Sequence, residues 1–186
     1  MKAFVLLLML IASMRLYAEP ATQPAKPPAI GEKAADFDLQ TLDGKSVKLS
    51  ELITRGPVVL IELRGWVGYQ CPVCTKQVGQ FIGQAKQFEK AGARVVLVYP
   101  GSAEKLRDHA GDFITGKSLP ENFYFVIDPD LAFTKAWGLH WDAKGENAYP
   151  ATFVIDTKQT IQFAKVSQSH GDRAAVKDVL DAIGKL

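Results

Sequence analysis

The sequence predicts an α/β fold in which helices flank a central mixed β-sheet, with a β-hairpin at its N-terminal end. Between residues 58 and 114, strand-like and helix-like patterns alternate, and a strand–helix–strand order builds parallel sheet. Residues 36–49 instead alternate in polarity around an Asp43-Gly44 turn, which is typical of an antiparallel hairpin. A chain of 186 residues is long enough for one domain with a sizeable core.

The N-terminal segment has the composition of a targeting signal. An apolar run, Ala3 to Met14, lies between Lys2 and Arg15 and is followed by polar sequence, so we expect a signal peptide over residues 1–18. The run of about 12 residues is shorter than the roughly 20 that span a bilayer. We therefore expect an exported protein, periplasmic in location, with an uncleaved anchor or a buried helix as the alternative.

Residues 19–29 contain four prolines and no apolar periodicity, so we expect an extended Pro-rich tether there. The domain itself then occupies residues 30–186. Removing residues 1–18 would remove two basic residues and no acid, which takes the formal net charge from +2 to 0. A chain without a positive field does not favour nucleic-acid binding, and we expect no stable membrane insertion after cleavage.

The remaining elements follow from residue patterns. Short runs rich in branched apolar side chains predict buried strands, and apolar residues three or four apart predict helices. The first helix begins at or just after the cysteines and continues to Gly92. The further elements, in order, are strands at 58–63, 94–99, 123–127, 151–155 and 161–166, helices around 106–114 and from near 172 onward, and a short helix before Trp137.

The chemistry is predicted at Cys71 and Cys74, the two cysteines of the chain. A structural disulfide across so short a loop would remove little chain entropy, and a zinc site would need further ligands at suitable spacing. We expect no metal and no cofactor. A Cys-x-x-Cys pair between a buried strand and a helix is typical of redox enzymes, because the helix N-terminus stabilises a thiolate. Cys71 is then the activated thiol, and Cys74 is placed to resolve a mixed disulfide.

Four segments of residues 30–186 resemble the peroxiredoxin-like branch of the thioredoxin superfamily, the alkyl hydroperoxide reductase/thiol-specific antioxidant group. This resemblance implies a thioredoxin-like fold, and it implies a cis Pro150 opposite the cysteines. The segments are Gly31 to Leu39 with the Asp43-Gly44 hairpin, Arg64 to Cys74, Ile127 to Asp130 leading to Trp137-Gly138, and Tyr149 to Asp156.

The sequence departs from the family pattern at the peroxide pocket. Similar peroxiredoxins carry a Thr three residues before the peroxidatic Cys, and here Cys71 occupies that place when Cys74 is aligned with the peroxidatic Cys. The Arg that polarises the peroxide falls at or near Pro150. Arg64 or Arg173 could supply the missing cation, although a solvated surface position is the simpler interpretation of Arg173.

The leading hypothesis is an exported thiol–disulfide oxidoreductase acting on protein or small-molecule thiols and disulfides. The second hypothesis is a thiol-dependent peroxidase, in which Cys74 reacts with a hydroperoxide and Cys71 resolves the sulfenic acid. Two alternatives are not enzymes. One is a copper-delivery module that uses His140 or His170, which we consider less favoured, and the other is a non-catalytic binding domain with inert, buried thiols. Trp66 and Tyr69 either shape a docking surface beside an exposed Cys71 or cover the core.

Overall fold

The computed structural model describes residues 25–186. The predicted signal peptide and the first part of the predicted tether lie outside the described residues. Residues 25–29 contain no helix or strand, and the Gly31 N–H donates to the Ile161 carbonyl at 2.8 Å. The chain thus joins the sheet close to the predicted domain start at residue 30. Within the described part of the chain, no helix is long and apolar enough to cross a membrane.

The regular elements lie close to their predicted positions. The strands are β1 (Asp38–Thr41), β2 (Ser46–Lys48), β3 (Val58–Glu62), β4 (Arg94–Gly101), β5 (Phe123–Pro129), β6 (Ala151–Ile155) and β7 (Ile161–Val166). The helices are α1 (Leu49–Leu52), followed by a 3-10 turn (Ile53–Arg55), then α2 (Pro72–Gly83), α3 (Ala85–Lys90), α4 (Leu106–Ile114), α5 (Ala132–Ala136) and α6 (Val176–Ile183).

The strands form one seven-stranded sheet in the order β2-β1-β5-β4-β3-β6-β7. Strands β3, β4 and β5 are parallel, while β1–β2, β1–β5, β3–β6 and β6–β7 pair antiparallel. The mixed sheet and the N-terminal hairpin are therefore confirmed. The crossover through α2 and α3 carries the chain from β3 to β4 and puts the Cys-x-x-Cys segment at the sheet edge where the parallel strands end.

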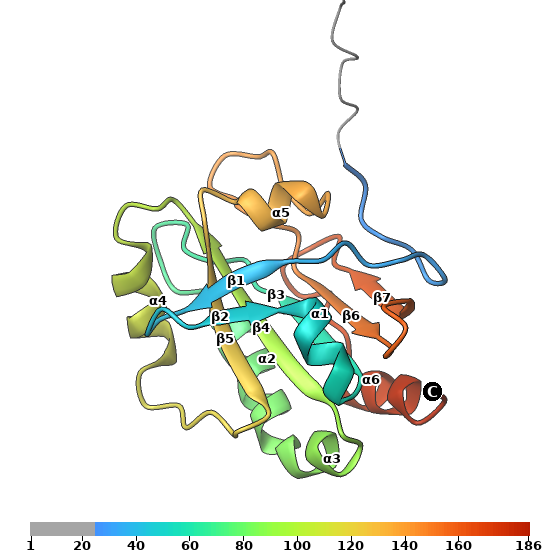
Figure 1. Cartoon of the computed structure of the whole chain (residues 1–186). Coiled ribbons are helices and arrows are strands. Elements are labelled where there is room, and N and C mark those ends of the chain that lie inside the picture. The colour runs from blue at the N-terminus through green and yellow to red at the C-terminus, as the bar shows by residue number, and fades with distance from the viewer. Residues whose placement is uncertain (1–24) are drawn as a thin grey trace, which may run out of the picture.

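Hydrophobic residues cover both faces of the sheet. Alternate side chains of β3 point to opposite faces: Val59 and Ile61 join the core beneath α2 and α6, whereas Val58 and Leu60 join the core beneath α1 and α5. Figure 1 shows α1 in front of the sheet and α2 behind it. This three-layer arrangement explains the continuous apolar run of β3, which is buried at every position.

Three local features differ from prediction. The single helix expected from the cysteines to Gly92 is interrupted at Gln84, whose backbone is not helical. Gly83 weakens the helix there by about 1 kcal/mol relative to Ala, and the break lets Phe81 stack on Phe88 at 5.5 Å. The last helix begins at Val176 rather than near residue 172. The short α1 was not predicted, because four residues carry too little periodicity to be recognised.

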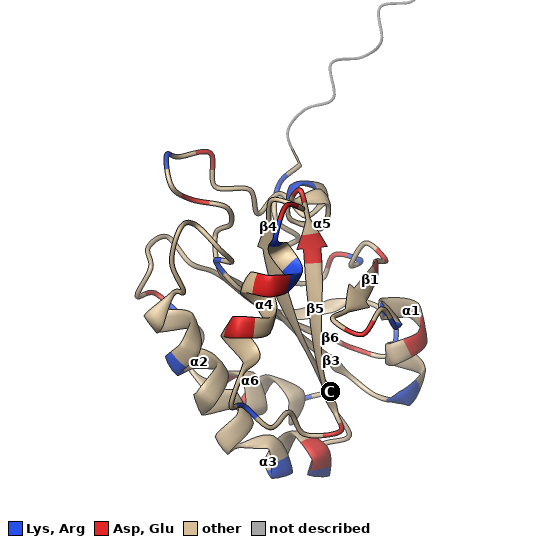
Figure 2. Cartoon of the chain, turned by 90° about the vertical axis from the view of Figure 1, so that its left-hand side faces the viewer, with Lys and Arg blue, Asp and Glu red and all other residues tan. Residues whose placement is uncertain are grey.

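Charged residues are distributed without a large area of one sign on the side of α4. Figure 2 shows acidic and basic positions interspersed over this side, with an acidic position at the end of β5. This distribution agrees with the small net charge of the sequence.

Candidate active site

The cysteines lie at the junction between a buried strand and a helix, as the sequence predicts. Cys71 is the N-cap of α2, and Pro72 occupies the first helical turn, where a missing N–H costs nothing. The Cys71 sulfur accepts the backbone N–H of Cys74 at 3.3 Å. Both cysteines are free thiols. The helix therefore directs an otherwise unpaired N–H at the Cys71 sulfur.

The environment of Cys71 favours its thiolate. A hydrogen bond from the Cys74 thiol, opposed by burial and aided by the backbone N–H of Cys74 and the charge of Arg173, lowers the pKa of Cys71 to about 5. These are the influences expected at a helix N-terminus next to a cation. These surroundings favour the thiolate form of Cys71 at neutral pH.

Cys74 has the opposite character, although two donors face it. Its sulfur accepts the backbone N–H of Arg64 at 3.5 Å and the Arg173 Nη2 at 3.7 Å. The pKa of Cys74 is nevertheless raised, because it donates to the Cys71 thiolate and is buried beside that charge. Cys74 thus holds the shared proton while Cys71 carries the negative charge.

Both cysteines are buried, so Trp66 and Tyr69 do not flank an exposed Cys71. The exposed fraction is 4% for Cys71 and 1% for Cys74, and both belong to the core beneath α2. The reason is that one side of the first turn of α2 packs against the sheet and carries the cysteines, while Pro72 and Thr75 on its outer side are exposed. The thiols are recessed, and the surroundings of Cys71 lower its pKa rather than raise it.

Arg64 is committed to a buried ion pair, so it does not supply the cation for a bound substrate. Its Nε lies 2.5 Å from Glu146 Oε2, and its Nη2 lies 2.8 Å from Oε1 of the same carboxylate. Nη2 also donates to the Gly145 carbonyl, and Nη1 donates to the Tyr69 hydroxyl at 2.7 Å. Only the backbone N–H of Arg64 faces a cysteine.

Arg173 is not the solvated surface residue that the sequence favours. It is half-buried, and its Nη2 contacts the Cys74 sulfur across a separation of 99 residues. Its Nε and Nη1 are buried without a hydrogen-bond partner. Arg173 is therefore the guanidinium with donors available beside the thiols. It fits the role of the missing cation, for which the sequence offers Arg64 and Arg173.

Trp66 has a supporting role in the loop that leads to Cys71. Its ring stacks on His109 of α4 with centroids 3.8 Å apart, and its carbonyl accepts the side-chain amide of Asn147 at 2.6 Å. Gln70, next to Cys71, donates to the His109 carbonyl and accepts the Tyr99 hydroxyl at 2.8 Å. These contacts fix the loop against α4 and β4, and burial raises the pKa of Tyr99.

Pro150 lies just before β6, at the sheet edge where β3 ends, because Ala151 pairs with Glu62. It is buried, and its carbonyl accepts the Ser167 N–H at 2.8 Å. Every peptide bond among residues 25–186 is trans, so the implied cis Pro150 is wrong. The trans form is the intrinsically favoured one for an X–Pro bond.

Sequence reasoning did not identify Glu146, Tyr99 or Gln70. Glu146 lies in an irregular loop after α5, and Tyr99 lies within an ordinary apolar strand. Neither position carries a local signal, since each meets the cysteine segment only through tertiary packing. Gln70 could have been suspected from its place next to Cys71.

The histidines do not join the cysteines. His170 Nε2 lies 2.9 Å from Glu146 Oε1, and His140 forms an isolated bridge with Ala148. Among residues 25–186, no group of three or more His, Cys, Asp or Glu side chains is arranged to hold a metal ion. The geometry gives no support to the copper-delivery hypothesis.

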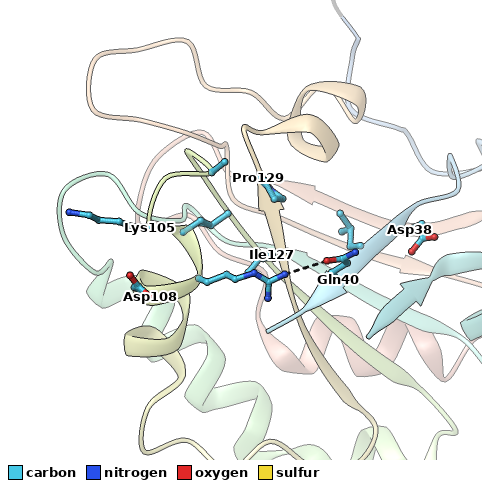
Figure 3. Close-up of a pocket in the computed structure, with 10 residues that line it drawn as sticks. Asp38, Gln40, Lys105, Asp108, Ile127 and Pro129 are labelled. Atoms are coloured by element: carbon cyan, nitrogen blue, oxygen red, sulfur yellow. Dashed lines mark hydrogen bonds between the residues drawn. The ribbon is translucent and has the colours of Figure 1, made fainter. Parts of the chain in front are cut away.

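The cleft between β1 and α4 is separate from the thiols. It has a volume of about 710 Å³ and is lined by residues that include Gln40, Lys105 and Asp108, but by neither cysteine. Figure 3 shows these side chains around the end of β5, with Gln40 bonded to the arginine of α4.

Comparison with known proteins decides the family. Residues 30–164 match the model of the AhpC/TSA family. The chain belongs to the AhpC/TSA family. Among relatives of this AhpC/TSA protein, peroxiredoxin Q (chloroplastic) of Oryza sativa subsp. japonica is 30% identical over 133 residues, which is 72% of this chain and 57% of the relative. Peroxiredoxin Q of Triticum aestivum is 31% identical over 133 residues, with the same coverage of 72% and 57%.

This AhpC/TSA chain thus spans little more than half the length of those plant relatives. The crystal structure of peroxidoxin BcpB from Mycobacterium tuberculosis superposes with a TM-score of 0.66 at 24% identity, covering 84% of this chain and 97% of that one. The mitochondrial 2-cys peroxiredoxin from Plasmodium falciparum gives a TM-score of 0.64 at 21% identity, covering 84% and 93%. These neighbours confirm the predicted thioredoxin-like fold.

Proposed function

We propose that this AhpC/TSA protein is a thiol–disulfide oxidoreductase in which Cys71 attacks and Cys74 resolves. The observation that carries the proposal is the asymmetry of the pair: Cys71 caps α2 and has its pKa lowered to about 5, whereas that of Cys74 is raised. Attack requires thiolate, and resolution requires a second thiol within one helical turn. Both requirements are met by residues already in place.

The reaction proceeds in two balanced steps. The Cys71 thiolate attacks one sulfur of a substrate disulfide, forms a mixed disulfide and expels the other half as a thiolate. Cys74 then loses its proton and attacks Cys71 Sγ, which closes the Cys71–Cys74 disulfide and releases the second half as a thiol. The substrate is reduced and the protein oxidised; the reverse sequence oxidises a dithiol.

Peroxide reduction is the second candidate, favoured by the family and by the donors at Cys74. The Arg64 N–H and Arg173 Nη2 face the sulfur that aligns with the peroxidatic position. In this route the Cys74 thiolate takes one oxygen from a hydroperoxide, forming a sulfenic acid and releasing an alcohol or water. Cys71 then expels water from the sulfenic acid to give the disulfide.

Single cysteine variants distinguish the two routes. For exchange, Cys71→Ser should abolish reaction with a model disulfide, while Cys74→Ser should accumulate the mixed disulfide. For peroxide reduction through Cys74, Cys71→Ser should still consume one equivalent of peroxide and Cys74→Ser none. A Cys71→Ser variant that exchanges disulfides at the wild-type rate would refute the proposed roles.

We also propose that the protein is exported, with the periplasm as its compartment. Support comes from the charged and apolar pattern of residues 1–18 and from the Pro-rich segment that follows. An oxidising compartment would suit a redox-active cysteine pair. Mass determination of the N-terminus of the protein recovered from cell fractions tests this; an intact Met1 on cytoplasmic protein would refute it.

A further inference from the structure

The resolving thiol receives its two donors from segments far apart in the sequence. The Arg64 backbone N–H and the Arg173 Nη2 meet at the Cys74 sulfur, at 3.5 and 3.7 Å, across separations of 10 and 99 residues. Neither donor is part of α2 itself. The environment of Cys74 therefore depends on whatever holds these two segments together.

One carboxylate contacts both segments. Glu146 forms a two-point ion pair with the Arg64 guanidinium, with exposed fractions of only 4% for Arg64 and 11% for Glu146. The same Oε1 lies 2.9 Å from Nε2 of His170, three residues before Arg173. Glu146 is thus placed between the segment that ends at Arg64 and the segment that carries Arg173.

The side chain of Arg173 has few anchors of its own. Its Nε and Nη1 are buried without a hydrogen-bond partner, so its position depends on the chain segment before it and on its contact with Cys74. On the other side, Asn147, the neighbour of Glu146, donates to the Trp66 carbonyl in the loop that leads to Cys71. The short loop around Glu146 therefore fixes the surroundings of both thiols.

We propose that Glu146 is a positioning residue for Cys74. The Glu146 carboxylate holds in place the two segments that donate to the Cys74 sulfur. The inference rests on the proposed exchange reaction, in which Cys74 resolves. Removing the charge of Glu146 leaves a buried Arg64 without its counter-ion, which destabilises that arrangement. The two donors then move away from Cys74, so that its thiolate is less stabilised and forms less readily. The resolving step therefore slows, while the attack by Cys71 persists.

The two steps can be measured separately with dithiobis(nitrobenzoate) and the reduced full chain. The first equivalent of nitrothiobenzoate reports attack by Cys71, and the second reports closure by Cys74. For Glu146→Gln we expect the second phase to slow about tenfold, the effect of roughly one unit in thiol pKa, with the first phase within about twofold of wild type. Asp142→Asn is the matched control, since it removes an exposed carboxylate from the same loop and should change neither phase.

The possible outcomes separate this inference from the proposed function. Release of only one equivalent by the wild type would refute the exchange reaction itself. Two phases in the wild type with an unchanged second phase in Glu146→Gln would refute only the role of Glu146, as would equal slowing of both phases. If Glu146→Gln does not fold, Glu146→Asp and His170→Asn are measured instead, and a second phase equal to wild type in both would refute the proposal.

Discussion

Two buried polar clusters lie on opposite faces of the sheet near the end of β3, and the pKa values of Cys71 in one and Glu62 in the other are shifted in opposite directions. On the α2 face, the pKa of Cys71 falls to about 5 at an exposed fraction of 4%. On the α5 face, the pKa of Glu62 rises well above its ordinary value at an exposed fraction of 0%. Burial alone raises the pKa of any acid. The difference therefore depends on the donors that each acid receives.

The Glu62 cluster shows what happens when donors are too few. The Thr134 hydroxyl lies 2.7 Å from Glu62 Oε1 and 2.6 Å from Asp128 Oδ2, but it has only one proton to donate. Asp128 also accepts the backbone N–H groups of Phe133 and Thr134, whereas Glu62 Oε2 has no hydrogen-bond partner. Burial and the neighbouring Asp128 carboxylate raise the pKa of Glu62 well above its ordinary value, and the single hydrogen bond from Thr134 offsets only part of that rise.

The largest expected effect comes from the loop that joins the two clusters. Gly65 has φ +74°, and a Cβ there would lie 1.9 Å from the Pro100 carbonyl oxygen. Because the clash is with backbone, Gly65→Ala should lower the free energy of unfolding by about 3 kcal/mol or more. Urea denaturation measures this, with Gly79→Ala on an open face of α2 as the control. Equal stabilities of the two variants would contradict the close approach.

Glu62→Gln should stabilise the protein at alkaline pH. A raised pKa in the folded state means that the contribution of Glu62 is fully present below about pH 4.3 and is lost as pH rises through the folded pKa. Gln mimics the protonated acid, so the stability of the variant relative to wild type should increase as the pH rises from 5 to 8. Unfolding free energies at pH 5 and pH 8 test it; a difference that does not grow with pH would be contrary evidence.

The pH profile of alkylation tests the difference in pKa between Cys71 and Cys74. The pKa of Cys71 near 5 predicts that its iodoacetamide rate rises through pH 5 and is flat between pH 6 and 8. Cys74 should react at least about tenfold more slowly at pH 6, since its thiolate is scarce. Site-resolved mass spectrometry after short pulses measures both rates. Two profiles that rise together above pH 8 would show that the asymmetry is absent.

The smallest expected effect is that of Arg173→Gln. Its positive charge contributes to the lowered pKa of Cys71 after the hydrogen bonds, so its loss should raise that pKa and slow Cys71 alkylation at pH 5.5 by about threefold, half a pKa unit. Lys177→Gln, in the exposed face of α6, removes a charge nearby in sequence and serves as the control. An identical slowing in both variants would assign the effect to overall charge.

Much of the fold was predictable because its signals are local. The alternation around Asp43-Gly44 and the apolar run of β3 each indicate their element without reference to the rest of the chain. The break at Gln84 was not predictable in the same way, because the stacking of Phe81 on Phe88 competes with helix continuity only once both rings meet the sheet.

The candidate site likewise has features with a local sequence signal and features that depend on tertiary contacts. The spacing of Cys71 and Cys74 after a buried strand is enough to place them one helical turn apart, and hence to give one sulfur the backbone N–H groups of a helix N-terminus. The pairing of Arg64 with Glu146, the contact of Arg173 with Cys74 and the burial of both thiols follow only from the packing of distant segments. The physical reason is separation: contacts across 82 and 99 residues depend on how α5, β6 and β7 pack against β3, and no local pattern encodes that packing.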